Sequence, residues 1–198
     1  TLFVSQDDSK ITVFRHVGEN VTPHVEICKL TGSIIMIKSP QGQNLLAPNH
    51  HLSPHYTRAT TDNDRGGMEL VLKFLYPDRG LEELYTKLHG TATYSYHFRW
   101  KFVGLDQAKP PQLTCSSSKI TATRNKHQVD IEAIVSVLKN GSSKKELIKQ
   151  KLVYKVYKDG RVLVSTHVMP RPALHCCVSL PRVGMSLALD KSLYNIQY

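Results

Sequence analysis

Residues 10–38 alternate between apolar and polar positions with the period of two that is typical of β-strands. Three such runs, rich in β-branched residues, predict strands over Lys10–His16, His24–Lys29 and Ser33–Lys38. Turn residues at Gly18-Glu19-Asn20 separate the first two strands, and Thr31-Gly32 joins the second to the third. This order predicts an antiparallel meander of hairpins at the start of the chain.

The middle of the chain breaks this alternation. Residues 43–67 contain two prolines, three histidines and a dense acidic turn, so we expect an irregular but ordered loop there. Leucines recur at helical spacing over Leu81–Leu88, which predicts one short helix after the break at Pro77. The segment Tyr94–Val103, just before Gly104, fits either a strand or a short helix, and both alternatives stay open.

Alternation returns in the second half of the chain, in longer runs than at the start. The strong turn signals Asn140-Gly141 and Asp159-Gly160 are typical of two-residue hairpins. The pattern predicts an antiparallel meander of about five strands over Leu113–Arg124, His127–Lys139, Lys149–Lys158, Arg161–Met169 and Ala173–Leu180. The whole chain is therefore predicted to be mostly β and antiparallel.

The charge of the chain adds a second feature to this picture. The 198 residues include 26 Lys+Arg and 16 Asp+Glu, a formal net charge of +10, and most of the excess lies between Lys119 and Arg161. A nucleic-acid surface needs aromatic residues among the bases, whereas only Tyr154 and Tyr157 lie nearby and no recognition motif occurs. We interpret the charge as the solvated outer face of a sheet with lysine-protected edges, and do not predict nucleic-acid binding. Polyanion binding by these hairpins is kept as an alternative.

Cellular location is left open by two opposing signals. The cysteines Cys28, Cys115, Cys176 and Cys177 form no C-x-x-C pair, so we predict buried free thiols, which favours a reducing, cytoplasmic compartment. The sequons Asn20-Val21-Thr22 and Asn140-Gly141-Ser142 point the other way. No run of about 18 apolar residues occurs, so no membrane association is predicted.

Candidate chemistry concentrates in Arg58–Gly66, where Asp62, Asn63 and Asp64 follow one another between two arginines. Three interpretations are open: oxygen ligands for a hard cation, a polar surface for sugar hydroxyls or another domain, and an Asx-rich turn whose carboxylates pair with arginine. Composition favours the Asx-rich turn. No metal site is predicted from His50, His51 and His55, which lack an acidic partner at ligand spacing, and no catalytic motif or residue is found.

Three stretches resemble the C-terminal β-domain of glycoside hydrolase family 2 β-galactosidases. The family's R-A-P-x-D-N-D-x-G block corresponds to Arg58–Gly66, with Thr60 in place of proline. In the family this block follows a hairpin and a leucine-proline segment, which Val25–Gly32 and Asn44–Pro48 match. The family's W-x-x-x-G-L-D segment corresponds to Trp100–Asp106, and its L-P-R-x-G stretch to Leu180–Gly184. The matches occur in the family's order, although residues 67–96 match poorly.

The resemblance implies that residues 1–198 are part of a single all-β domain, a β-sandwich of the antiparallel supersandwich type that is related to the galactose-mutarotase-like fold. The family's full enzyme hydrolyses terminal β-galactosides with retention, using two glutamates about 5 Å apart on a (β/α)₈ barrel. Neither glutamate lies in this chain, which begins at Thr1 and stops at Tyr198, where the family's G-R-G-P block would begin. We therefore expect a truncated, non-catalytic portion of a longer glycosidase.

In the family this domain packs on the barrel and borders the galactoside site. The resemblance thus implies a substrate-proximal or interdomain role for Arg58, Asp62, Asn63 and Asp64, and a packing role for Trp100. The implied partners are the remainder of the parent glycosidase, with its catalytic barrel, and a galactoside or other carbohydrate. We expect no cofactor in this chain, although the parent family often uses Mg²⁺ and Na⁺. The alternative is a stand-alone carbohydrate-binding or interaction module.

Overall fold

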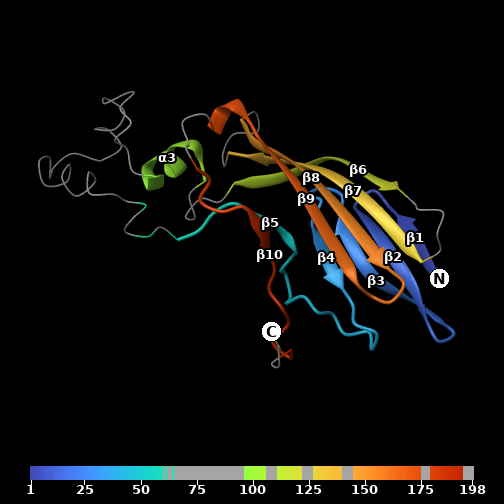
Figure 1. Ribbon diagram of the computed structural model, residues 1–198. Coiled ribbons are helices and arrows are strands. Elements are labelled where there is room, and N and C mark those ends of the chain that lie inside the picture. Colours follow the sequence, from blue (N-terminus) through green and yellow to red (C-terminus); the bar gives the residue numbers. More distant parts are fainter. Residues whose placement is uncertain are drawn as a thin grey trace, which may run out of the picture.

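The computed structural model contains two antiparallel sheets of four strands each, packed as a sandwich, and a separate pair of short strands (Figure 1). It describes residues 1–59, 61, 64, 96–105, 111–121, 127–139, 145–174 and 179–193. The first sheet has the order β1-β2-β3-β4, the second has the order β6-β7-β8-β9, and β5 pairs with β10. The predicted all-β antiparallel sandwich is confirmed.

The first sheet is the meander predicted from the alternation near the N-terminus. Its strands are β1 (Leu2–Gln6), β2 (Lys10–Val17), β3 (Asn20–Cys28) and β4 (Ile34–Ile37). The three predicted strands are confirmed as β2, β3 and β4. Strand β1 was not predicted, because only Leu2 of its five residues is buried and the strand forms by pairing its backbone with β2.

The second sheet consists of four longer strands from the C-terminal half. They are β6 (Gln112–Thr121), β7 (Gln128–Leu138), β8 (Glu146–Tyr157) and β9 (Val162–Pro170). Strand β7 shows strict alternation of buried and half-buried positions, and β8 shows it beyond Ile148, as the sequence pattern requires for one face on a core. The prediction of a fifth strand over 173–180 is wrong at its start, where Pro172–Leu174 form a 3₁₀ turn closed by a bond from Leu174 N–H to Arg171 O.

The remaining described elements are short. Strand β5 (Ser53–His55) pairs antiparallel with β10 (Gly184–Ser186), and neither was predicted, because a three-residue strand has no periodicity to detect. Of the two alternatives for Tyr94–Val103, a strand or a short helix, the structure shows a helix, α3 (Tyr96–Val103). It ends at Gly104, which has a positive φ of 95°. The helix predicted over Leu81–Leu88 lies outside the described residues. Within the described residues, no helix has the length and apolarity needed to cross a membrane.

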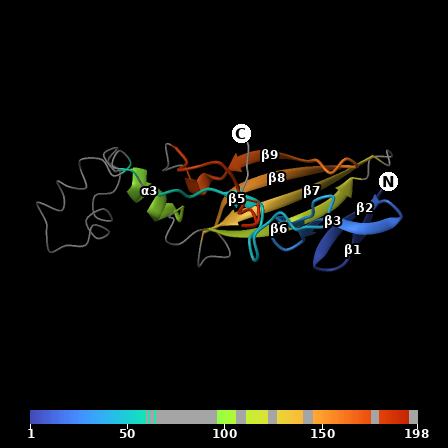
Figure 2. The same cartoon turned by 90° about the horizontal axis from the view of Figure 1, so that it is seen from below.

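Apolar side chains from both sheets form one core between the layers. Helix α3 lies beyond the ends of the strands (Figure 2). A second cluster lies at the end of the sandwich under α3, where Trp100 and Val103 of the helix join Val137, Leu147 and Ile148 of the second sheet. The helix therefore closes one end of the molecule and is attached to the second sheet by apolar contacts.

Three lysines of the basic region lie on the outer face of the interior strand β8. Lys149 and Lys151 alternate there with buried residues, and Lys151 pairs with Glu132 at 2.8 Å. Hydrogen bonding from Lys151 is the main cause that holds the pKa of the Glu132 carboxyl below its usual value. The structure thus agrees with a solvated sheet face. The prediction that lysines protect the edges of the sheet is wrong for β9, because this edge strand contains no lysine.

The turn between β3 and β4 packs directly against the second sheet at Gly32. The Tyr154 hydroxyl on β8 donates a hydrogen bond of 2.7 Å to the carbonyl oxygen of Gly32, and Cys115 N–H on β6 donates one of 2.6 Å to Leu30 O. A Cβ atom at Gly32 would lie 2.7 Å from Cγ2 of Val135, and Gly32 has a φ of +70°. Only glycine fits here without displacing the facing sheet.

The free thiols of Cys28 and Cys115 are both half-buried. They agree with the expectation of unpaired cysteines in that part of the chain, although neither is completely buried as predicted. The other two, Cys176 and Cys177, lie outside the described residues.

We expect the substitution Gly32→Ala to lower the free energy of unfolding by about 3 kcal/mol or more, since it adds a core clash to the left-handed backbone penalty. The matched control is Gly42→Ala, at a φ of +85° with no atom within 4 Å of the added Cβ. This control should lose only about 1–2 kcal/mol. Chemical denaturation measures both, and equal losses would contradict the close approach of the sheets at Gly32.

Candidate functional site

Arg58 follows strand β5 in an extended segment that is anchored to the second sheet. Two residues earlier, the buried Tyr56 donates a hydrogen bond of 2.5 Å from its hydroxyl to Oε1 of Gln150 on β8. Burial raises the pKa of the Tyr56 hydroxyl, so the group stays protonated and remains a donor. Because Tyr56 is held in this way, the direction of the Arg58 side chain is set by the sandwich itself.

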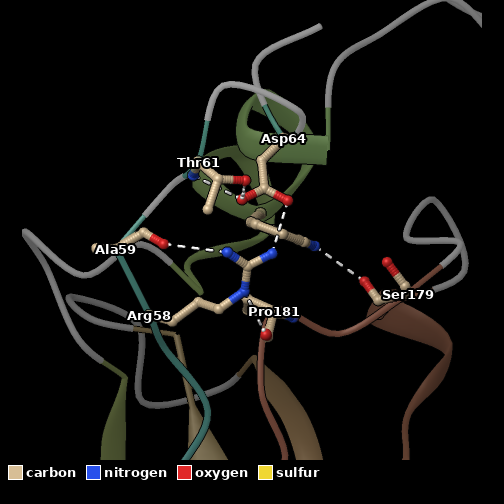
Figure 3. Close-up of polar contacts among 7 residues, drawn as sticks. Arg58, Ala59, Thr61, Asp64, Ser179 and Pro181 are labelled. Carbon is tan, nitrogen blue, oxygen red and sulfur yellow. Dashed lines mark hydrogen bonds and ion pairs between the residues drawn. The ribbon is translucent and has the colours of Figure 1, made fainter.

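The Arg58 guanidinium is bonded on three sides (Figure 3). Its Nε donates to the carbonyl oxygen of Pro181 at 2.8 Å, its Nη1 to the carbonyl oxygen of Ala59 at 3.1 Å, and its Nη2 to Oδ1 of Asp64 at 2.6 Å. The last contact is an ion pair in which 33% of the Arg58 side chain stays exposed. Arginine suits this position because its planar donors spread in three directions from one rigid group.

Both carboxylate oxygens of Asp64 are hydrogen-bonded. Its Oδ2 accepts hydrogen bonds of 2.8 Å from both the backbone N–H and the hydroxyl of Thr61, and only 6% of the residue is exposed. Burial alone would raise the pKa of the carboxyl, but the bonds from Arg58 and Thr61 and the charge of Arg58 outweigh burial, so the pKa is lowered. Asp64 is therefore ionised at neutral pH and serves as the acceptor that orients Arg58.

An aromatic pair forms the other wall of the site. The Arg58 guanidinium carbon lies 5.1 Å from the centroid of the Trp100 ring, within the range of a cation–π contact. Trp100 is buried and donates from Nε1 to the carbonyl oxygen of Ser179 at 2.9 Å. Tyr96 stacks on it with 6.1 Å between ring centroids and is 42% exposed. Trp100 thus has the packing role that the resemblance implies.

Three segments that are far apart in the sequence meet around the Arg58 guanidinium. These segments are residues 58–64, helix α3 and residues 179–181. Each contains or lies next to one of the sequence stretches Arg58–Gly66, Trp100–Asp106 and Leu180–Gly184. Neither the sequence pattern nor the residue types predicted this contact, because the acceptors at Ser179 and Pro181 are backbone carbonyls. Only the nearby L-P-R-x-G stretch hinted that this part of the chain matters.

The structure brings together two of the four predicted site residues, Arg58 and Asp64. The other two, Asp62 and Asn63, lie outside the described residues. For Asp64, the interpretation as a turn carboxylate that bonds a backbone N–H and pairs with an arginine agrees with the geometry. The substrate-proximal or interdomain role of these residues stays a prediction.

The loop histidines do not form a cluster with acidic residues. His55 lies 3.4 Å from Arg182 Nη1 and 3.4 Å from the Thr57 hydroxyl, and burial, together with the Arg182 charge, lowers its pKa. His50 and His51 are exposed. In the part of the chain that the structure describes, no group of three or more His, Cys, Asp or Glu residues is arranged to hold a metal ion.

The chemistry available at this site is that of a contact surface. Among the described residues around Arg58, the only carboxylate is Asp64, and its oxygens already accept three hydrogen bonds. The exposed groups include part of the Arg58 side chain and the Tyr96 ring, which stacks on Trp100. A cation beside an exposed aromatic ring is typical of a protein–protein interface.

We expect Asp64→Asn to lower the free energy of unfolding by about 1–2 kcal/mol at pH 7, because the charge-assisted bond to Arg58 is lost. The ionised carboxylate stabilises the fold above its unfolded pKa of about 3.9, and this contribution is lost as pH falls through the lower folded pKa. The difference between wild type and variant should therefore shrink as pH falls below about 4.

The control for this experiment is Asp190→Asn. Asp190 also accepts bonds from the N–H and hydroxyl of a following residue, Ser192, and among the described residues it forms no ion pair with an arginine. Denaturation from pH 7 to pH 3 measures both variants. A loss in the Asp190 variant equal to that in the Asp64 variant would show that the arginine pair adds nothing.

Comparison with known proteins gives one family. The model of a family described as beta galactosidase small chain matches residues 19–198, which is nearly the whole chain. The matched range includes all three segments that meet at Arg58. A search of curated proteins gave no match.

Proposed function

The chain belongs to the beta galactosidase small chain family, and we propose that it is a non-catalytic β-sandwich domain of a β-galactosidase-type glycoside hydrolase. In this proposal the domain packs on the catalytic barrel of the parent protein and borders the galactoside site. The barrel supplies the two glutamates that cleave the glycosidic bond with retention. The proposal assigns no cofactor to this chain.

The observation that carries the proposal is the convergence of three segments on Arg58. The guanidinium is held by Asp64, by the Pro181 carbonyl and by the Trp100 ring. Together with the bond to the Ala59 carbonyl, the hydrogen bonds to described residues use three of its five N–H donors and leave a third of the side chain exposed. The other two donors form no bond to a described residue, and their fixed orientation supports a role in binding an acceptor on another protein surface.

The position of the site also supports this role. Helix α3 and the Arg58 segment lie together at one end of the sandwich, away from the β8–β9 turn (Figure 1). The exposed Tyr96 ring, stacked on Trp100, adds apolar area at the same end. A partner that covers this end would bury an aromatic ring and an arginine, the residue types that contribute most to interface affinity.

We expect the isolated chain to show no hydrolysis of a chromogenic β-galactoside, because the acid/base and nucleophile belong to the barrel. Mixing it with the parent glycosidase from which this domain has been deleted should restore turnover in proportion to the complex formed. Turnover by the chain alone would contradict the proposal. Binding of galactose to the chain alone at micromolar concentration would favour a stand-alone carbohydrate-binding module instead.

We expect Arg58→Ala to weaken the apparent Kd of this reconstitution by about 10–100-fold, which corresponds to the loss of charge-assisted hydrogen bonds. Titration of activity against chain concentration measures the Kd, and the saturating rate should change less than the Kd. A melting curve of the isolated variant checks that the sandwich remains folded.

The chain offers a closely matched control, Arg161→Ala. Arg161 also pairs with an aspartate, Asp159, at 2.7 Å and lies 5.3 Å from an aromatic ring, that of Tyr157. It lies in the β8–β9 turn, at the opposite end of the sandwich (Figure 1). Equal weakening by both variants would show a general charge effect and would overturn the assignment of the Arg58 end as the interface.

A further inference from the structure

Two buried polar side chains lie at the end of the sandwich opposite Arg58. His24 of β3 is 1% exposed and Arg15 of β2 is 5% exposed, which is unusual for residues of these types. Both lie under the β8–β9 turn, since a Cβ on Gly160 of that turn would be 2.7 Å from Nη1 of Arg15 and 3.9 Å from Cε1 of His24. The turn therefore covers a histidine and a cation inside the molecule.

His24 connects the two sheets through backbone carbonyls. Its Nδ1 lies 2.9 Å from the Lys38 carbonyl oxygen, just after β4, and its Nε2 lies 3.2 Å from the Gly160 carbonyl oxygen. A carbonyl oxygen only accepts hydrogen bonds, and a neutral imidazole carries one N–H, so neutral His24 satisfies one of these contacts. An imidazolium would satisfy both. The geometry thus favours protonation of the ring.

Burial and the charge of Arg15, in contrast, disfavour protonation of His24. Burial is the largest cause that lowers the pKa of His24, the charge of Arg15 is the next, and together they outweigh the two carbonyl contacts, which raise it. In the part of the chain that the structure describes, Arg15 forms no ion pair, and its buried Nε has no hydrogen-bond partner. A second positive charge on His24 would therefore stand beside one that is already uncompensated.

The other charged groups around His24 do not remove this conflict. Lys38 contributes only its carbonyl. In the turn, Asp159 accepts bonds from the backbone N–H and Nε of Arg161, so its charge is already paired, and Lys158 adds a further positive charge. Bonding to the Arg161 N–H is the main cause that lowers the pKa of Asp159, so this carboxyl remains ionised while a histidine titrates.

We propose that His24 is an acid-sensitive latch that holds the β8–β9 turn closed over the end of the core. With neutral His24 the turn stays closed over Arg15. When the imidazole takes up a proton from solvent, the two buried positive charges repel, the turn opens, and both side chains gain water.

The sign of the pH dependence follows from linkage. In the open state His24 has its ordinary pKa of about 6.5, whereas in the closed state its pKa is lower. The open state therefore binds the proton more tightly, and the opening equilibrium constant rises as pH falls below about 6.5. Because opening is linked to the uptake of one proton, the opening equilibrium constant can rise at most tenfold per pH unit. The rise levels off below the pKa of His24 in the closed state.

Hydrogen exchange of the Gly160 amide, followed by NMR on the whole chain, tests the proposal. This amide bonds to the Tyr157 carbonyl at 3.0 Å, inside the turn. After correction for intrinsic exchange, its opening constant should rise up to tenfold per pH unit below pH 6.5 in wild type and stay flat in His24→Gln. The Gly42 amide, bonded to Ser39 O at 3.1 Å in another turn, should stay flat in both. The same slope in the variant, or at Gly42, would overturn the latch.

A second measurement does not depend on the folding of the His24 variant. NMR titration of the His24 ring should give a pKa below 6.5 in wild type and a higher pKa in Arg15→Gln, because the neighbouring charge is gone. A wild-type pKa at or above 6.5, or an unchanged or lower pKa in the Arg15 variant, would overturn the proposal.

Discussion

The close approach of the two sheets at Gly32 is the constraint on which the sandwich depends. The turn at the end of β3 lies directly on β7, so that its backbone, and not a side chain, fills the space beside Val135. The Tyr154 hydroxyl then reaches the Gly32 carbonyl from β8. Since both groups are buried, an unmade bond would leave two polar atoms without water, and this contact aligns the sheets as well as joining them.

Once the sheets are aligned, the two ends of the sandwich acquire different properties. At one end, Trp100 and the apolar ends of β7 and β8 form a second cluster, and Arg58 is held over it by neutral and charged acceptors. At the other end, Arg15 and His24 lie under a turn with no carboxylate bonded to either in the described residues. At the first end the charge of Arg58 is paired with Asp64, which holds its side chain in place. At the second end the charge of Arg15 is unpaired among the described residues, which makes this end sensitive to protonation of His24.

Most of the fold could be predicted because long strands with one buried face carry a strong period of two. Strands β2, β3, β7 and β8 are visible from alternation, and the turns at Gly18 and Gly160 from residue types that tolerate positive φ. Strands β1, β5 and β10 were missed, because backbone pairing with a neighbour produces them and few of their side chains are buried. The strand predicted from Ala173 fails because local proline and turn bonding override the apolar pattern.

The sequence by itself determined the all-β class, the order of most strands and the family, since each depends on residue types and spacings along the chain. Only the tertiary structure decided that Arg58 meets Trp100 and the Pro181 carbonyl, and that Gly160 covers His24 and Arg15. The physical reason is that these contacts join segments distant in sequence, and several of them use backbone carbonyls. A carbonyl is the same at every residue, so no residue pattern shows which one a side chain will reach.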